Sequence, residues 1–402
     1  MATIQSQRPL PPGWRWARLG EVCEIIAGQS PPGDTYRKVP EGLPFFQGKA
    51  DFGLWHPVAQ CWCVAPTKIA LPGDILISVR APVGPTNVAD AECCIGRGLS
   101  AIRPRAEVDR DFVLAALKLF EGKLEKLGSG STFGAIKRDD LESIEIPFPS
   151  VEEQRRIATI LNDQMAAVER ARAAAETQLE AGKALPASYL RAVFSSPEAQ
   201  KWLVRKLGDV GEIVSGVTLG RKLNGAETRR VPYLRVANVK DGYLSLSDVY
   251  EIEATEAEIA KCTLRAGDLL LTEGGDPDKL GRGTFWQDQI AECIHQNHIF
   301  RVRLNPQEFS PEFVSAQVGS PYGKAYFLTH AKQTTGIATI NQKVLGSFPL
   351  LVPPLADQRR IAEMLNERIT SAERTRKAIE EELETVNKLP AALLRRACNG
   401  EL

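Results

Sequence analysis

The sequence predicts an α+β chain: two similar mixed α/β bodies separated by two long antiparallel coiled-coil helices, in a pseudo-two-fold tandem duplication. The main evidence is a repeat. Residues 151–195 and 355–399 align without a gap at an offset of 204, and 19 of the 45 positions are identical. Random pairing of residues would give roughly 5–8% identity. A repeat on this scale decides how every other feature is interpreted.

The bodies that precede these segments are also related. Residues 14–28 match residues 202–216 at an offset of 188, and the offset grows to 204 by Ile136 and Ile340. Insertions therefore fall inside the second body, in surface loops that tolerate them at little cost. We predict four parts, namely a first body at 13–150, a central helical spacer at 151–195, a second body at 196–354 and a C-terminal helical spacer at 355–402.

Each body has the pattern of a mixed α/β domain. The apolar runs Ile75–Val79, Asp268–Thr272 and His298–Val302 have strand length and lie between Gly, Pro and Asp residues. The segments 136–149 and 340–354 predict a short helical turn, then a strand with a proline stop, then the start of the long helix.

The repeated segments predict long helices. Their apolar residues recur at spacings of four, three and seven, which places one narrow stripe along a helix and suits pairing with another helix. About 35 residues precede each of Pro186 and Pro390, roughly 50 Å of helix, and we expect both prolines to break or bend it. The residues predicted to pair the helices are Leu161, Met165, Val168, Leu179, Leu365, Ile369, Ile379 and Leu383.

Composition excludes some classes of protein. The 402 residues are 43% apolar and 25% charged, which is ordinary for a globular protein. No run of 18 apolar residues predicts a membrane span, and the N-terminus lacks a signal pattern, so we expect a cytoplasmic protein with eight mostly reduced cysteines. The 50 basic and 50 acidic residues neither favour nor exclude a polyanionic partner.

The chain carries no complete catalytic motif. Gly323-Lys324 lacks the remainder of a phosphate-binding loop, because Ala325 replaces the hydroxyl residue. The Asn/Asp-Pro-Pro-Tyr/Phe signature of adenine methyltransferases is missing. Asp268 and Glu273 match part of a metal nuclease site, but no Glu-x-Lys follows. We therefore predict a non-catalytic chain without a cofactor of its own, and a standalone enzyme is the less favoured reading.

Two sets of residues offer metal ligands, and a structural role is favoured for both. His295 and His298 lie near Cys293, but three positions apart in a strand-like run they point to opposite faces. Packing or base contact is favoured over zinc. Four further cysteines lack the usual Cys-x2–4-Cys pairs of a zinc site: Cys61, Cys63, Cys93 and Cys94.

The repeated junction between body and helix has a family resemblance. IPFPSVEEQRRIA and LVPPLADQRRIA each join a strand with a proline stop to a long helix. From about residue 13 to 399, the chain resembles the DNA-specificity (S) subunit of a type I restriction–modification system, which has two target recognition domains. The resemblance implies that each body reads half of a split double-stranded DNA site and that the helices set the gap.

The resemblance also implies partners. Two methyltransferase (modification) subunits would methylate adenine with S-adenosylmethionine, and a separate motor and nuclease (restriction) subunit would use ATP and Mg. These cofactors would belong to the partners. A spacer of roughly 50 Å exceeds one DNA turn of roughly 34–36 Å, and bodies that differ in sequence predict an asymmetric bipartite target. The alternative is a coiled-coil interaction scaffold without DNA specificity.

Polar clusters beside the apolar strands are the candidate DNA contacts. Arg, Lys, Asn and Gln read base edges, and Lys, Arg, Ser and Thr bind phosphates. Arg155-Arg156 and Arg359-Arg360 are expected instead on a partner-docking or solvated helix face. The predicted DNA-binding residues are Arg80, Arg97 and Lys137 in the first body, and Lys279, Arg282, Gln296, Asn297, Thr335 and Lys343 in the second.

Overall fold

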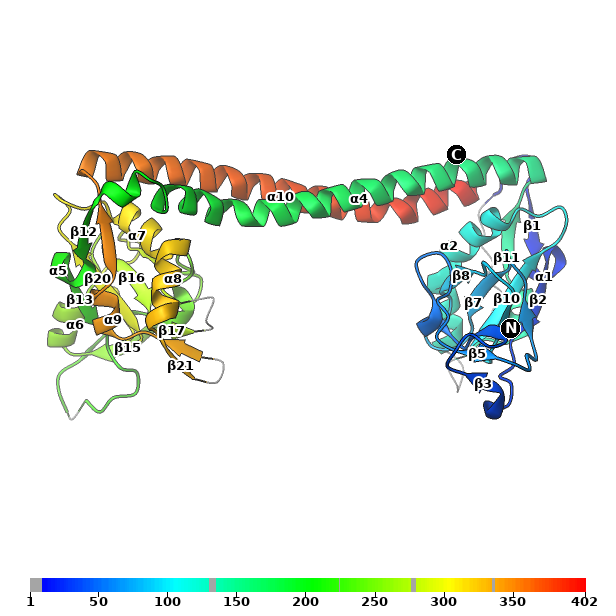
Figure 1. Ribbon diagram of the computed structural model, residues 1–402, viewed down its shortest axis with the longest axis horizontal. Helices are drawn as coiled ribbons and strands as arrows, with labels where there is room; N and C mark the ends of the chain where they lie inside the picture. Colours follow the sequence, from blue (N-terminus) through cyan, green and yellow to red (C-terminus); the bar gives the residue numbers. More distant parts are fainter. Residues whose placement is uncertain (1–8, 130–134, 224, 276–279, 335–336) are drawn as a thin grey trace. The chain divides into compact units, whose positions relative to one another are not determined.

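The computed structural model describes residues 9–129, 135–223, 225–275, 280–334 and 337–402. The chain divides into two compact units, of which the first contains residues 1–176 and 381–402 and the second residues 177–380. Each unit therefore holds one body together with a segment of each long helix (Figure 1).

The first body is built from short strands and a few helices that precede the long helix α4. Its elements are β1 (Arg15–Arg18), α1 (Leu19–Val22), β2 (Cys23–Ala27), η1 (Gly33–Thr35), β3 (Tyr36–Arg37), β4 (Leu43–Phe46), η2 (Lys49–Asp51), β5 (Trp62–Cys63), β6 (Ile69–Ala70), β7 (Ile75–Ser78), β8 (Thr86–Val88), β9 (Cys93–Ile95), β10 (Leu99–Pro104), α2 (Arg110–Ser129), α3 (Arg138–Glu142), β11 (Glu145–Phe148) and α4 (Val151–Phe194).

The second body has a similar order with additional helices and strands, and it is followed by the long helix α10. Its elements are η3 (Ala199–Lys201), β12 (Leu203–Lys206), α5 (Leu207–Val210), β13 (Gly211–Ser215), β14 (Arg229–Leu234), η4 (Val236–Asn238), β15 (Tyr250–Ala254), α6 (Glu256–Cys262), β16 (Leu269–Thr272), β17 (Gly274–Gly275), β18 (Gly283–Phe285), β19 (Ile294–His295), β20 (Ile299–Leu304), α7 (Pro311–Gly319), α8 (Pro321–His330), β21 (Lys332–Thr334), β22 (Ile337–Thr339), α9 (Gln342–Gly346), β23 (Pro349–Val352) and α10 (Leu355–Asn399).

The two bodies share a four-stranded sheet of the same topology, while their second sheets have five strands in the first body and three in the second. An antiparallel four-stranded sheet has the order β2-β10-β7-β8 in the first body and β13-β20-β16-β18 in the second. A second sheet contains one parallel pair, β4 with β9 and β14 with β19. The first strand of each body pairs with its last, β1 with β11 and β12 with β23. The predicted mixed α/β bodies and their duplication are confirmed.

The last segment of each body, residues 136–149 and 340–354, forms part of the hydrophobic core of that body. The short helix and the strand before each long helix bury their apolar side chains beneath α2 in the first body and α7 and α8 in the second. Six of these side chains are at most 1% exposed: Leu141, Ile144, Ile146, Leu345, Phe348 and Leu350. Their burial holds the strand that leads directly into the long helix.

The long helices pair antiparallel within each unit. In the first unit, Leu161 and Val168 near the start of α4 share a buried cluster with Val386 and Leu393 near the end of α10. In the second unit the ends are reversed, and Phe194 at the end of α4 packs in the cluster that holds the start of α10. The predicted antiparallel pairing is therefore confirmed.

The predicted apolar stripe does more than pair the helices. Leu161, Val168 and Leu365 are buried, and Leu365 packs into the core of the second body. In the first unit, α2 adds Phe112 and Ala115 to the helix cluster. The other stripe residues are partly exposed, and they are Met165, Leu179, Ile369, Ile379 and Leu383. The stripe was expected to contact only the other long helix, but near the bodies it also packs against the body.

The two prolines were predicted to break or bend the long helices, and neither of them breaks its helix. Pro186 lies inside α4 and Pro390 inside α10, and both helices continue beyond them. A proline removes one backbone hydrogen bond and clashes one turn back. Apolar residues that follow each proline, Leu190 and Leu393, pack against their unit and hold the helix in place.

A buried glutamine fastens each body to its long helix. Gln154, in the first turn of α4, is fully buried, accepts a hydrogen bond from the Asp109 amide (2.9 Å) and donates one to the Pro149 carbonyl (3.0 Å). Gln358 makes the same two bonds in the second unit, with the Ser310 amide (3.0 Å) and the Pro353 carbonyl (2.9 Å). Since buried backbone groups need partners, each side chain satisfies two that would otherwise lack them.

We expect Gln154→Leu to destabilise the first unit by about 1–3 kcal/mol, because the substitution leaves a buried donor and a buried acceptor unpaired. Gln358→Leu should do the same in the second unit. Urea unfolding of the full chain measures the loss. The matched control is Gln178→Leu, an exposed helix glutamine, which should change the stability by less than about 0.5 kcal/mol. Equal urea midpoints for Gln154→Leu and the wild type would contradict the fastening role.

Candidate nucleic-acid interface

Three polar segments of the first body meet through backbone hydrogen bonds. The Val79 amide donates to the Gly98 carbonyl (2.9 Å), and the Ile136 amide donates to the Val79 carbonyl (3.0 Å). Arg80 and Ala135 form an isolated antiparallel bridge next to them. We call this region the first loop edge and define it as residues 78–80, 95–98 and 135–138.

The first loop edge carries the three predicted contacts of this body. Arg80, Arg97 and Lys137 all lie on it and are exposed. Within the described part of the chain, none of the three forms an ion pair, so their positive charges are available to a ligand. Whether they touch DNA stays a prediction.

The second body builds an equivalent edge. The Glu273 amide donates to the His298 carbonyl (2.9 Å), and the Ile340 amide donates to the Glu273 carbonyl (2.8 Å). These bonds match those of the first body at the offsets found in the sequence. The strand Gly274–Gly275 then pairs with β22. The second loop edge is defined as residues 272–275, 280–283, 295–298 and 337–343.

A glycine in each body allows the backbone of the central loop of the edge to approach the glycine backbone closely. A Cβ atom on Gly28 would lie 2.2 Å from the Gly96 carbonyl oxygen, and one on Gly216 would lie 1.9 Å from that of His295. Both distances are far inside van der Waals contact, so any side chain here would push the loop away. The repeated glycine therefore fixes the position of residues 95–98 and 295–298.

The predicted residues of the second body have different environments. Lys343 is exposed in the first turn of α9, and Arg282 is half-buried. Gln296 accepts a hydrogen bond from the Val236 amide through Oε1 (3.1 Å), so part of this side chain has a structural role. Asn297 Nδ2 lies 3.4 Å from His298 Nε2. Two further predicted residues, Lys279 and Thr335, lie outside the described residues.

The two histidines of the second loop edge have opposite surroundings, as predicted. His295 is fully buried, with Nδ1 3.0 Å from the Ile299 carbonyl oxygen. His298 is exposed, and its Nδ1 lies 2.5 Å from Glu273 Oε2. Among the described residues, no group of three or more His, Cys, Asp or Glu side chains has an arrangement that could hold a metal ion.

The cysteines considered as zinc ligands lie in the packed interior. Cys63 and Cys94 belong to one buried cluster, with Cys61 partly buried against it, and Cys93 belongs to another. Burial raises the pKa of Cys93 to about 12. Three of the four cysteines are buried, and they divide between two packed clusters.

The repeated Gly-Asp pair is structural. Asp268 is buried and accepts two hydrogen bonds from the Arg303 guanidinium (2.7 and 2.6 Å). Asp74 is bound in the same way by Arg103 (3.0 and 2.7 Å). The partial nuclease pattern at Asp268 and Glu273 is thereby explained, since Asp268 is already neutralised by an arginine.

The arginine pairs at the helix starts lie on a salt-bridged face. Arg156 binds Glu153 through two hydrogen bonds of 2.7 Å, and Arg360 binds Asp357 at 2.8 Å. This matches the expected solvated face. Exposed ion pairs of this kind contribute little to stability.

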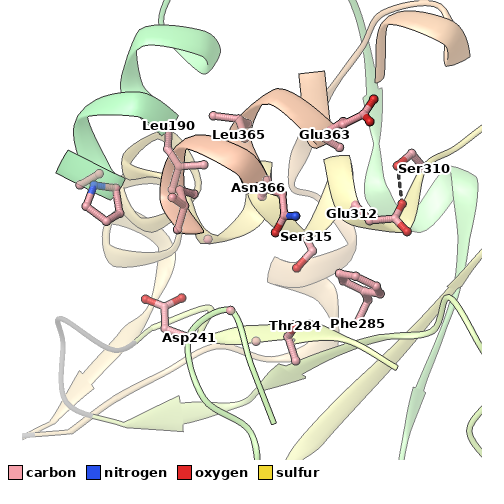
Figure 2. Close-up of a pocket in the computed structure, with 18 of the residues that line it drawn as sticks. Leu190, Asp241, Thr284, Phe285, Ser310, Glu312, Ser315, Glu363, Leu365 and Asn366 are labelled. Carbon is pink, nitrogen blue, oxygen red and sulfur yellow. Dashed lines mark hydrogen bonds between the residues drawn. The ribbon is translucent and has the colours of Figure 1, made fainter. Parts of the chain in front are cut away.

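The second unit also contains a hollow of about 810 Å³ between its helix segments and its body. Figure 2 shows side chains from α4, α10, α7 and β18 around it. Apolar and polar groups are mixed, and Ser310 Oγ donates to Glu312 Oε2 at one side (2.6 Å). The labelled lining residues are Leu190, Asp241, Thr284, Phe285, Ser310, Glu312, Ser315, Glu363, Leu365 and Asn366.

Alignment of the two copies puts Lys118 of the first unit opposite Gly319, which lines the hollow. The Lys118 ammonium group lies 5.2 Å from the centre of the Trp55 ring. Gly319, at the equivalent place in the second unit, has no side chain that could make this contact.

The comparison with known families agrees with the duplicated architecture. The family model of the type I restriction modification DNA specificity domain matches residues 11–177 and 199–385. The chain belongs to this family. The resemblance stated from the repeated junction is confirmed, and with it the role of a type I specificity subunit with two DNA specificity domains.

Several individual proteins are similar to this chain. The chain is 26% identical to the type I restriction enzyme EcoKI specificity subunit of Escherichia coli over 98% of this chain and 90% of that protein. It is 48% identical to the MjaX specificity subunit of Methanocaldococcus jannaschii, over 37% of this chain and 36% of that protein. The crystal structure of the HsdS subunit from Thermoanaerobacter tengcongensis is 55% identical over 42% of each chain, with a TM-score of 0.38.

The sequence did not single out the two fastening glutamines. Gln154 and Gln358 are identical at the 204-residue offset, and this identity was the available signal. The adjacent arginine pairs carry more obvious chemistry.

In the residues that the structure describes, no helix has the length and apolar character needed to cross a bilayer.

Burial of His295 predicts a pH-dependent stability of the second unit. Burial lowers the pKa of His295 from 6.5 to about 4. Between these values the unfolded chain binds a proton that the folded chain does not. The contribution of His295 to the free energy of unfolding is therefore fully present above about pH 6.5. It is lost as the pH falls towards 4, by up to about 3 kcal/mol.

We expect the urea midpoint of the second unit to fall when the pH is lowered from 7.5 to 5.0. The matched variant is His295→Ile, because Ile95 pairs with Phe46 in the first body as His295 pairs with Leu234 in the second. This variant should lose most of the pH dependence in that window. The same pH dependence in variant and wild type would rule out His295 as the cause.

Proposed function

We propose that this chain is the non-catalytic subunit that directs a type I restriction–modification complex to an asymmetric bipartite site in double-stranded DNA. Each body reads one half-site through its loop edge. The observation that supports this most directly is the pair of edges, which share the same backbone hydrogen bonds but carry different side chains.

The chemistry of the two edges supports different half-sites. Arg80, Arg97 and Lys137 offer donors and positive charge, which suit phosphates and the acceptor atoms of guanine. The second edge adds Asn297, a side chain that suits adenine, beside Gln296, whose Oε1 already accepts from the Val236 amide. One frame presenting two sets of side chains favours a target whose halves differ.

The long helices are the proposed binding surface for the partner subunits. Since their sequences are repeated at a constant offset, they offer two similar surfaces, which suits two copies of a modification subunit. The partners would supply the chemistry, with S-adenosylmethionine for adenine methylation and ATP and Mg for a motor and nuclease subunit. The complex would act on DNA in the cytoplasm.

A coiled-coil scaffold without its own DNA specificity is the alternative function. The two differ in their response to salt, because phosphate contacts release counterions and make DNA binding strongly salt-dependent. A DNA-reading chain should also retain sequence preference at salt concentrations that remove non-specific binding. A scaffold should show no such preference.

Co-expression of this chain with its modification subunit should methylate adenine at one asymmetric, gapped sequence. Sequencing of methylated bases across the host genome measures this directly. The modification subunit expressed alone serves as the control and should leave that sequence unmethylated. Methylation scattered without a common motif would contradict the proposed function.

A further inference from the structure

We propose that Glu273, oriented by His298, is a specificity-determining residue of the second half-site that accepts a hydrogen bond from the amino group of a cytosine. This inference rests on the proposed function. It assigns to one exposed ion pair the choice of one base.

The first observation is the geometry of the pair. His298 Nδ1 lies 2.5 Å from Glu273 Oε2, and the side chains are 55% and 34% exposed. Because a carboxylate carries no hydrogen, the imidazole Nδ1 is the donor. Within the described part of the chain, the second carboxylate oxygen, Oε1, has no hydrogen-bond partner, so it is free to accept one from a ligand.

The second observation is the place of the pair on the edge. The backbone of Glu273 bonds both to His298 and to Ile340, so it lies where the three segments of the second loop edge meet. Gly274 and Gly275 follow it and carry no side chains that could cover the carboxylate. The backbone of Glu273 is thus held where the segments meet, and its side chain is partly exposed.

The third observation is charge. The described residues of the second loop edge include the acidic side chain Glu273 and the basic side chains Arg282 and Lys343, and Asp276 and Asp278 follow Glu273 in the sequence. A carboxylate facing DNA is repelled by the phosphates and is tolerated only where it meets a donor. In the major groove the cytosine N4 amino group is the donor that Glu and Asp accept from.

The first body provides the contrast. Val79 occupies the position of Glu273 and is buried, and Gly98 occupies that of His298. The described part of the first loop edge therefore has no acidic side chain and presents the donors of Arg80, Arg97 and Lys137. The backbone structure of the edge does not require the Glu273–His298 pair, because the first body forms the same backbone hydrogen bonds without such a pair.

The pair could instead act as a clasp that only stabilises the loop. Exposed ion pairs of this type add little stability, and a clasp would not determine which base stands at one position. The identity of the methylated sequence therefore separates the two roles, whereas activity alone would not.

The experiment uses the full chain with its modification subunit and reads the methylated motif of each variant. Glu273→Ala should relax one cytosine-containing base pair of one half-site by roughly 5- to 150-fold. Glu273→Gln should shift that position towards adenine, because glutamine pairs with adenine N6 and N7. His298→Gln should relax the same position, by a smaller factor.

The matched control is Arg97→Ala in the first body, which should relax a position in the other half-site only. A wild-type motif without a C·G pair in the half-site that Glu273→Ala affects would overturn the assignment. So would an unchanged motif in Glu273→Ala, or an equal loss at every position of that half-site. A wild type that methylates no bipartite motif would instead contradict the proposed function itself.

Discussion

Each half of this chain depends on one buried glutamine that joins a body to its long helix. Gln154 and Gln358 lie in the first turn of α4 and α10, and each satisfies a carbonyl before the helix and an amide at the start of α2 or α7. A buried amide side chain with both partners in place fixes direction as well as position. The helix therefore leaves the body at a set angle, while loops elsewhere are free to change.

This arrangement separates the constant parts of the chain from the variable ones. The four-stranded sheet, the closing strand and the glutamine junction are the same in both halves. Insertions fall inside the second body, and the loop edges of the two halves carry different side chains. A specificity subunit needs this division, because its bases can then change without disturbing the surfaces that hold its partners.

Much of the fold followed from internal repetition, because two copies of one pattern show which positions matter. Leu345 and Phe348 could be assigned to the core from their counterparts in the first body. The sequence could not show that both helices continue through Pro186 and Pro390, because the packing that holds them comes from residues distant in the chain. Nor could it pair His298 with Glu273, whose counterparts Gly98 and Val79 carry no such chemistry.

The central claim is that the bodies determine which bases are recognised, whereas the junctions only hold the bodies on the long helices. The most direct test replaces residues 15–148, from the start of β1 to the end of β11, with residues 203–352, from the start of β12 to the end of β23. The chain then carries two second bodies on unchanged junctions, and the methylated motif is measured. The account predicts an inverted repeat of the second half-site. An asymmetric motif that retains the first half-site would contradict it.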